Sequence, residues 1–242
     1  MKRFIMFFAL LFGASLMANR KGTLCLTFDD LYLNSWKKAL PFFAEYQAHV
    51  TFFIWGTVDS TVISDLKKLQ DAGHSIGLHS INHTRAADYQ KEHGKGAYTR
   101  DEILSQLDSC RKNNIQIRSF AYPFSQRTEE TDQELFKYFD FLRTNCSLVK
   151  AAGVPLSKAD GCFVKQVGKK QLFYGFPSSG DFNIDEVKAA MKRASEENAV
   201  LVFYAHNIVE NPQRNNITYS QLKQILDYAK TLGMSICGMN EL

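Results

Sequence analysis

The stretch TLCLTFDD, residues 23–30, decides the fold of this 242-residue chain. It is a run of β-forming, mostly apolar residues that ends abruptly in two adjacent carboxylates, Asp29 and Asp30. Two like charges at the end of an apolar strand cost free energy unless something compensates them. We therefore expect a buried strand that brings both carboxylates to a site where a cation offsets their charge.

Outward from this stretch, the chain alternates between strand-like and helix-like segments. Strands are expected at residues 23–28, 49–56, 74–80, 118–124, 141–145, 171–177, 199–207 and 234–239. Helices are expected at residues 35–47, 64–73, 99–114, 128–140, 183–198 and 220–233. Continuous apolar strands that alternate with helices favour a parallel sheet covered by helices. The pattern predicts an α/β fold, a distorted TIM-like (β/α) barrel of about seven to eight parallel strands, with an open doubly wound sheet as the alternative.

The region after the third expected strand carries two local expectations. Thr99 is followed three residues later by Glu102, a capping-box signature, so a helix is expected to begin there. Residues 85–98 lack such a pattern, and we expect them to form a loop insertion on the face that carries the site.

The composition fits one folded domain. The chain is 45% hydrophobic and 13% aromatic, which is enough for a sizeable core and unlike a disordered chain. The formal charge is +4, and Lys2 and Arg3 contribute two of these charges. Because no basic stripe with interleaved aromatic residues is present, no nucleic-acid partner is expected. No linker or repeat divides the chain, and nothing in it indicates an oligomeric state.

Residues 1–18 are typical of a secretory signal peptide. A short positive region at Lys2 and Arg3 precedes an apolar run from Phe4 to Phe12, and the chain can be cut near Ala18. The apolar run is short for a membrane-spanning helix. We therefore expect an exported protein, periplasmic or secreted, without a stable membrane span.

The five cysteines form no CxxC pair and no short metal-binding spacing. Cys25 and Cys237 lie on the first and last expected strands, which become neighbours if the barrel closes. Their thiols would then approach each other, and two buried thiols are a simpler interpretation than a disulfide.

Polar residues follow the carboxyl ends of four expected strands, where β/α barrels carry their catalytic residues. Asp29 and Asp30 directly follow the first strand, and His79 and His83 lie at or just after the end of the third. Residues 122–124 end the fourth strand, and His206 lies at the end of the strand at 199–207. A lone histidine after an apolar strand is often structural. On the same rim as a metal site, however, His206 suits a general acid.

Two histidines and one carboxylate suit a metal site. His79 and His83 are four residues apart, so a helical turn after the strand would place both imidazoles on one face. With one aspartate they make a three-ligand set that leaves positions for water and substrate. The other aspartate then acts as a general base on water. Surface histidines on a helix and an aspartate at a helix N-terminus are the structural alternatives.

Four motifs resemble those of one family. TFDD at 27–30, HSINH at 79–83, RSFAYPF at 118–124 and LVFYAH at 201–206 are similar, in order and approximate spacing, to motifs of the polysaccharide deacetylases. This is the NodB-homology domain of carbohydrate esterase family 4. The resemblance covers residues 22–242 and implies one domain with a distorted β/α barrel.

The resemblance assigns roles by position. Asp29 would be the catalytic base, and His206 would be the general acid. Asp30, His79 and His83 would hold one divalent metal ion, usually zinc and sometimes cobalt or nickel.

The resemblance also extends to further positions. Asp181, followed by Phe182 where the family has tryptophan, would lie near the catalytic histidine and raise its pKa, with a solvated loop aspartate as the alternative. The backbone N–H of Phe124 is the expected donor to the oxyanion. Tyr122 and Tyr204 are expected to contact the substrate.

The implied reaction is a metal-dependent hydrolysis that removes acetyl groups, foremost N-acetyl groups, from a poly- or oligosaccharide. An O-acetyl esterase acting on a xylan-type glycan is one alternative, and a catalytically impaired carbohydrate-binding homologue is another. Two histidines and a carboxylate also suit a mononuclear iron oxygenase, although such sites usually rest on antiparallel β-folds. The expected partner is an acetylated glycan.

Three positions depart from the usual family pattern. Leu31 replaces the glycine that often follows TFDD, and Tyr204 stands where leucine usually lines the acetyl pocket. Ala121 occupies the position of the arginine that orients the base in many members. Arg118 lies three residues earlier and is not its equivalent, so the sequence leaves open what orients Asp29.

Overall fold

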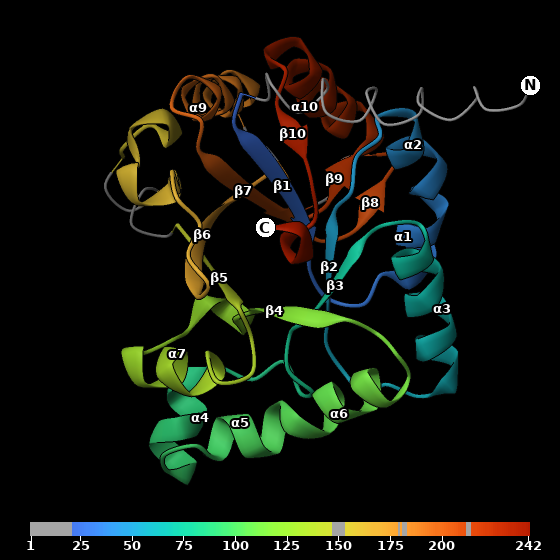
Figure 1. Ribbon diagram of the computed structural model, residues 1–242, viewed down its shortest axis with the longest axis vertical. Helices are drawn as coiled ribbons and strands as arrows, with labels where there is room; N and C mark the ends of the chain where they lie inside the picture. The colour runs from blue at the N-terminus through green and yellow to red at the C-terminus, as the bar shows by residue number, and fades with distance from the viewer. Residues whose placement is uncertain (1–20, 147–152, 179, 181–182, 212–213) are drawn as a thin grey trace, which may run out of the picture.

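The structure is a computed structural model that describes residues 21–146, 153–178, 180, 183–211 and 214–242. The predicted signal peptide, residues 1–18, lies outside the described residues. In the described part, seven parallel strands form a ring: β1 (Thr23–Phe28), β2 (Thr51–Ile54), β3 (Ser75–Leu78), β4 (Ile117–Ala121), β5 (Phe141–Asn145), β6 (Gln171–Pro177) and β7 (Val200–Ala205). Each strand pairs with the next, and β7 pairs with β1 along its whole length, which closes the ring (Figure 1). The predicted β/α barrel is confirmed, and the open sheet is excluded.

A short eighth strand distorts the barrel. β10 (Ser235–Ile236) pairs with Thr23 and Leu24 at the start of β1, whereas β2 pairs with Thr27 and Phe28 at its end. β10 therefore lies beside β1 only where β1 begins, and β2 lies beside it where β1 ends. After β7, the short strands β8 (Ile208–Val209) and β9 (Ile217–Thr218) form a separate two-stranded sheet.

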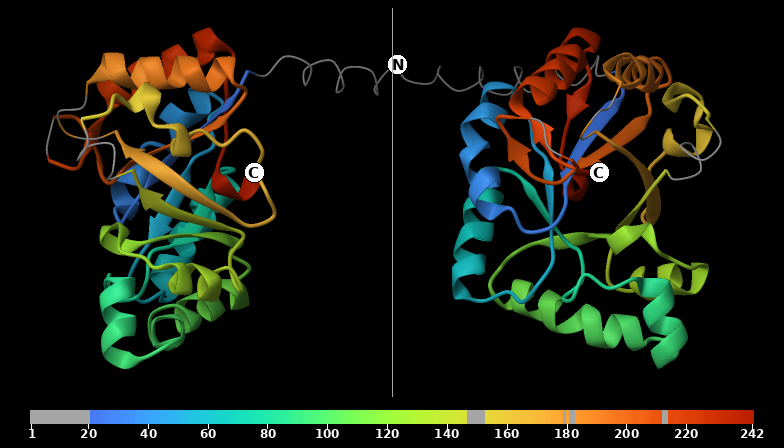
Figure 2. Two further views of the ribbon diagram at one scale, coloured as in Figure 1. Left: turned by 90° about the vertical axis from the view of Figure 1, so that its left-hand side faces the viewer. Right: turned by 180° about the vertical axis from the view of Figure 1, so that it is seen from behind.

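Helices cover the outside of the ring (Figures 1 and 2). They are α1 (Leu33–Lys38), α2 (Leu40–Glu45), α3 (Ser60–Asp71), α4 (Ala86–His93), α5 (Ala97–Glu102), α6 (Leu104–Lys112), α7 (Glu129–Leu135), α9 (Ile184–Glu196) and α10 (Tyr219–Leu232). The short 3₁₀ helices are η1 (Pro123–Ser125), η2 (Leu156–Lys158), η3 (Asp160–Cys162) and η4 (Met239–Glu241). Within the described residues, no helix has both the length and the apolar character needed to cross a bilayer.

Both local expectations for residues 85–114 are wrong. Ala86–His93 forms the helix α4 rather than a loop, because Ala86 and Gln90, four residues apart, are buried together on one face. The next helix begins at Ala97, after Gly96 with a φ of 74°, so Thr99 lies inside it and caps nothing. Glu102 is instead buried and hydrogen-bonded to Asn82.

Alternation along β1 sets the direction of the first carboxylate. Leu24, Leu26 and Phe28 pack in the apolar cluster that includes the surrounding helices, whereas Cys25 packs in a separate cluster with residues such as Phe53. Successive side chains of a strand point to opposite faces. Asp29, the next odd-numbered position after Thr27, therefore continues the row that faces into the barrel.

The C-terminus closes the other end of the barrel. Met239 of η4 is buried in the interior cluster, and its N–H donates to Oγ1 of Thr51 at 2.8 Å. The N–H of Asn240 donates to Oγ of Ser75 at 3.0 Å. Since Thr51 and Ser75 begin β2 and β3, η4 fills the end at which the strands start. The opposite end remains available for a site.

Candidate active site

A cavity of about 680 Å³ lies where the strands end. The predicted residues that line it are Asp29, Asp30, His79, His83, Tyr122, Phe124, Tyr204 and His206. Asp181, also predicted, lies outside the described residues. A second cavity of about 710 Å³ shares Tyr32 with the first but contains none of the predicted catalytic residues.

The two aspartates line the same cavity because the backbone turns sharply between them. Asp29 directly follows β1 and continues its pairing with β7, because its N–H donates to the carbonyl of Ala205 at 2.9 Å. Asp30 has a φ of 79°, which is uncommon for a residue other than glycine and ends the alternation of the strand. Burial, with a smaller effect of the neighbouring Asp29 carboxylate, raises the pKa of Asp30 above its usual value.

Asp30, His79 and His83 converge on one point. The Nε2 atoms of the histidines lie 3.2 Å apart. The Oδ1 atom of Asp30 lies 3.5 Å from Nε2 of His83 and 4.0 Å from Nε2 of His79. Ligands about 2.1 Å from a tetrahedral ion lie roughly 3.4 Å from one another, so these three atoms fit a divalent metal. No other trio of His, Cys, Asp or Glu side chains in the described residues comes together in this way.

Both imidazoles are prepared to act as neutral ligands. Nδ1 of His79 donates to the carbonyl of Ala121 at 2.7 Å, which leaves the lone pair of Nε2 directed at the point where the three atoms converge. Burial lowers the pKa of His79 to about 3. Burial also lowers the pKa of His83. Neither ring therefore has to lose a proton at neutral pH before it binds a cation.

The loop that joins the two histidines is not helical, and that prediction is wrong. Ser80 and His83 have φ values of 66° and 53°, and the turn between them brings the rings together. Glu102 holds this loop: its carboxylate accepts from the N–H of Asn82 at 2.8 Å and from its Nδ2 at 2.9 Å. The carbonyl of Glu102 accepts from the N–H of Ile81 at 3.0 Å.

Asp29 is held by Arg143, a residue that the sequence reasoning missed. Arg143 lies on β5, and its Nη2 atom donates to Oδ1 of Asp29 in an ion pair that is almost completely buried. Burial alone would raise the pKa of Asp29, but the charge of Arg143, helped by His79 and His206, brings it below the usual aspartate value. The carboxylate is thus ionised and oriented at neutral pH.

Small residues on neighbouring strands make room for this arginine. Ala121 on β4 is the register partner of Arg143 on β5. The position that carries arginine in many family members, here Ala121, therefore lies next to Arg143. On β6, a Cβ atom at Gly175 would lie 3.2 Å from Cδ of Arg143. The guanidinium lies 4.9 Å from the ring centroid of Tyr204 and 5.3 Å from that of Phe53. Both Ala121 and Tyr204, two departures from the family pattern, therefore surround Arg143.

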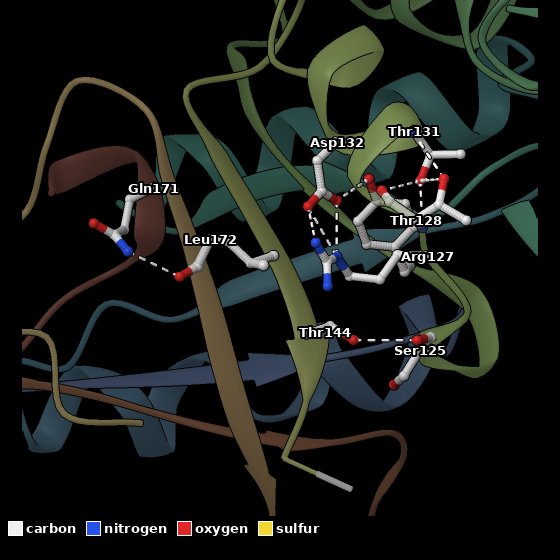
Figure 3. Close-up of polar contacts among 9 residues, drawn as sticks. Ser125, Arg127, Thr128, Thr131, Asp132, Thr144, Gln171 and Leu172 are labelled. Carbon is white, nitrogen blue, oxygen red and sulfur yellow. Dashed lines mark hydrogen bonds and ion pairs between the residues drawn. The ribbon is translucent and has the colours of Figure 1, made fainter. Parts of the chain in front are cut away.

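The loop after β4 is fixed by a polar network (Figure 3). Nε of Arg127 donates to Asp132 at 2.9 Å, and Oγ1 of Thr144 donates to the carbonyl of Ser125 at 3.2 Å. The hydroxyl of Tyr122 donates to Asp132 at 2.7 Å, so this group is committed to the network although the residue lines the cavity. The network holds Phe124, which has a φ of 52°, an exposed side chain, and a ring centroid 4.7 Å from that of His83.

His206 follows β7 directly and is half-buried. Its Nδ1 atom lies 3.0 Å from the carbonyl of Asn215 and donates to it, because a carbonyl can only accept. Nε2 is thereby left to exchange a proton within the cavity. Nε1 of the fully buried Trp36 donates to the carbonyl of His206 at 3.1 Å, which fixes the backbone at this point.

Solved structures share this fold. A family 4 carbohydrate esterase from Streptomyces lividans, solved with acetate, has a TM-score of 0.58 at 17% identity, and the match covers 91% of this chain and 93% of that one. A CE4 esterase from Streptococcus mutans has a TM-score of 0.57 at 19% identity, and the match covers 91% and 87% of the two chains. At such identities the likeness concerns the fold alone.

Sequence comparison adds the family. The peptidoglycan-N-acetylmuramic acid deacetylase PdaA of Bacillus subtilis (strain 168) is 29% identical over 99 residues, 40% of this chain and 34% of that protein. The chain thus matches about a third of the length of this relative. The polysaccharide deacetylase family model matches residues 17–138, half of the chain. Together with the barrel and the motif residues gathered at its rim, this match shows that the chain belongs to the polysaccharide deacetylase family.

Proposed function

We propose that this protein is a metal-dependent hydrolase that removes acetyl groups, foremost N-acetyl groups, from a poly- or oligosaccharide. One observation carries the proposal: a convergent trio of metal-ligating atoms shares a cavity with an ion-paired carboxylate and a histidine. A metal site, a base and an acid in one cavity are the parts that acyl hydrolysis requires.

Asp30, His79 and His83 would hold the metal, with zinc favoured by the ligand types and cobalt or nickel as alternatives. The bound ion would polarise the acetyl carbonyl and lower the pKa of water towards about 7. Asp29, oriented by Arg143, would accept the proton of the attacking water. The backbone N–H of Phe124 is the proposed donor to the oxyanion.

His206 would complete the reaction by protonating the leaving group from Nε2. Its donation through Nδ1 to the carbonyl of Asn215 supports this role, because that hydrogen bond fixes the ring. An amine is a poorer leaving group than an alkoxide, so His206 matters most for N-deacetylation. O-acetyl ester hydrolysis on a xylan-type glycan remains the second candidate, since the same groups serve it. Asp181 stays a proposed neighbour of His206.

Charge at the cavity supports an acidic glycan. Among the described arginines, Arg85, Arg111 and Arg214 have no ion-pair partner, and two of these, Arg85 and Arg214, line this cavity. The guanidinium of Arg85 lies 4.7 Å from the ring centroid of Phe124, beside the metal ligands. Arg214 precedes Asn215, beside the proposed acid. These two arginines would attract a sugar that carries a carboxylate, such as the N-acetylmuramic acid in the name of the B. subtilis relative.

Acetate release from a panel of glycans tests the function. The panel holds N-acetylated chito-oligosaccharides, peptidoglycan fragments and acetylxylan, each with and without a chelator. We expect release from an N-acetylated glycan that a chelator abolishes and added zinc restores, also without oxygen, which an iron oxygenase would require. Release that a chelator does not affect, or no release from any glycan, would contradict the proposal and, in the second case, favour a carbohydrate-binding homologue.

Two variants test the assigned roles. Asp29→Asn and His206→Ala should each abolish release while the protein retains its metal, because neither side chain is a proposed ligand. Metal analysis of both purified variants gives the second measurement. Full activity in either variant would remove that residue from the mechanism.

Export is a separate proposal, and it rests on the sequence of residues 1–18. Mass spectrometry of the protein from the periplasm or medium of an expressing bacterium tests it. A chain that begins at Asn19 supports export, and an uncut chain confined to the cytoplasm contradicts it.

A further inference from the structure

We propose that Cys146 and Cys162 form a disulfide bond that ties the end of β5 to η3. Their Sγ atoms lie 2.7 Å apart. This separation is well inside the roughly 3.5–4.0 Å at which unbonded heavy atoms attract each other. It exceeds the covalent S–S length of about 2.05 Å by only about 0.7 Å. The proposal defines a modification site and does not depend on the hydrolase activity.

The fold holds both cysteines in place. The N–H of Cys146 donates to the carbonyl of Gly175 at 2.9 Å, which continues the pairing of β5 with β6. Cys162 is 3% exposed, and its N–H donates to the carbonyl of Ala159 at 2.9 Å. The backbone of each cysteine is thus fixed by its own hydrogen bond, so the sulfur atoms meet because of the packing of two elements.

Arg193 anchors the element that carries Cys162. Its guanidinium pairs with Asp160 of η3 at 2.7 Å and lies 4.2 Å from the ring centroid of Phe163. It also donates to the carbonyl of Ser157 at 3.0 Å. Because Arg193 belongs to α9, η3 is docked on a long helix on the outside of the barrel.

The pair considered from the sequence, Cys25 and Cys237, is a weaker candidate. Their Sγ atoms lie 3.9 Å apart, the distance of a thiol hydrogen bond. In each pair one cysteine is buried, Cys25 or Cys162, and the other is half-buried. The Sγ–Sγ distance therefore distinguishes the two pairs. We expect Cys25 and Cys237 to remain thiols.

Bond formation removes two electrons and two protons, and the oxidant is another disulfide, by exchange. The Cys146 sulfur attacks the partner disulfide, forms a mixed disulfide and releases one thiol. Cys162 then loses its proton and attacks the Cys146 sulfur, which releases the second thiol and leaves both electrons on the partner. The hydrogen bond with Cys146 and burial raise the pKa of Cys162, so we expect the second step to be the slower one.

The bond would restrain a wall of the active-site cavity. Asn145, which directly precedes Cys146, lines that cavity, and Arg143 lies on the same strand. The two cysteines are 16 residues apart, so the cross-link would also remove conformational freedom from the unfolded chain.

Peptide mapping tests the proposal. The purified protein is incubated with oxidised glutathione, unfolded, alkylated without reduction and digested. We expect a linked peptide pair that contains Cys146 and Cys162, and alkylation of Cys25, Cys110 and Cys237. Five alkylated cysteines, or a link between any other two, would overturn the proposal.

Thermal unfolding supplies a second measurement. We expect the oxidised protein to melt on the order of 5–10 °C above the reduced protein. The difference should vanish in Cys146→Ser and persist in the matched control Cys237→Ser. Equal melting temperatures of the oxidised and reduced wild-type protein would refute the stabilising cross-link even if both variants failed to fold.

Discussion

At the scale of single residues, the orientation of Asp29 depends on Arg143, which lies on the strand next to the one that carries the arginine in many family members. Arg143 and Ala121 are register partners on β5 and β4, so both positions face the same side of the sheet. A guanidinium on either strand can therefore reach the same carboxylate. Gly175 leaves the space for the side chain, and Tyr204 packs against it.

Replacement of Arg143 should impair catalysis. We expect Arg143→Ala to lower kcat on the order of 100-fold, because Asp29 would lose its orientation and its compensating charge. KM should change much less, since the guanidinium pairs with the base rather than with solvent or substrate. Steady-state kinetics on the best glycan of the panel measures both, and metal analysis should show an unchanged content.

A double variant that transfers the arginine from β5 to β4 provides the sharpest control. In the double variant Ala121→Arg with Arg143→Ala, the arginine returns to the usual family position, and we expect much of the lost kcat to return. Ala121→Arg alone should not raise activity, because two guanidinium groups would compete for one carboxylate in a packed interior. No recovery in a double variant that is folded and binds metal would argue against a positioning role for Arg143.

At the scale of elements, the proposed metal ligands depend on a loop that a buried glutamate holds. Asn82 lies between the two histidines, and Glu102, at the end of α5, binds both its backbone and its side chain. This contact also explains why the capping-box prediction was wrong: the glutamate serves a loop distant in sequence rather than its own helix. Local pattern cannot distinguish these two uses of a carboxylate.

Loss of this contact should weaken metal binding. We expect Glu102→Ala to reduce zinc affinity about 10-fold or more, which is typical when a group that supports metal ligands is removed. Competition with a chromophoric chelator measures the affinity. Glu102→Gln retains one acceptor oxygen, so its zinc affinity should lie between those of Glu102→Ala and the wild type. A zinc affinity of Glu102→Ala equal to that of the wild type would contradict the role of Glu102.

His74, which directly precedes β3, should make stability depend on pH. Nδ1 of this buried ring accepts from the N–H of Val50 at 3.1 Å. Burial, with a smaller effect of His49, lowers the pKa of His74 to about 4. The unfolded chain has a histidine pKa of about 6.5. Between these values the unfolded state binds more protons, so the free energy of unfolding falls as the pH falls.

The His74→Gln variant measures this contribution. A pKa difference of roughly 2.5 units corresponds to about 3 kcal/mol, present above pH ~6.5 and lost on acidification to about pH 4. Urea unfolding at several pH values, with a chelator present, should therefore show a flatter profile in the variant. His79 acts in the same direction, so part of the slope should remain. An unchanged slope would contradict the contribution of His74.

At the scale of the whole molecule, closure of the barrel brings charges from distant segments to one rim. The described carboxylates that line the cavity are Asp29 and Asp30, and the first is paired with Arg143. Arg85 and Arg214 also line the cavity and add positive charge. A bound divalent cation would leave the cavity with a positive balance, which favours anionic glycans.

Selectivity for acidic glycans tests this balance. We expect the double variant Arg85→Gln with Arg214→Gln to lose several-fold more kcat/KM on a carboxylate-bearing glycan than on a neutral chito-oligosaccharide. Added salt should also reduce the preference of the wild type for the carboxylate-bearing glycan over the neutral one. Arg111→Gln, which removes an unpaired arginine away from the cavity, is the matched control. Equal losses on both glycans would contradict a charge-based preference and leave the hydrolase function intact.

The sequence by itself determined the class of fold and the residue types of the candidate metal site. Alternating apolar strands and helices specify a covered parallel sheet, and the motif residues follow the strand ends, where any β/α barrel would place them. These are local properties, carried by a few consecutive residues. They hold whatever the register between strands.

Only the tertiary structure decided which side chains meet. Arg143 and Asp29 are 114 residues apart, and their contact depends on the registers of several strands together with the small residues that leave room. Likewise, Cys146 lies near Cys162 because the residue that follows β5 meets η3, which contacts β6, whereas the pair suggested by adjacent strands stays at hydrogen-bond distance. Such contacts arise from packing between elements, which the local periodicity of the sequence does not encode.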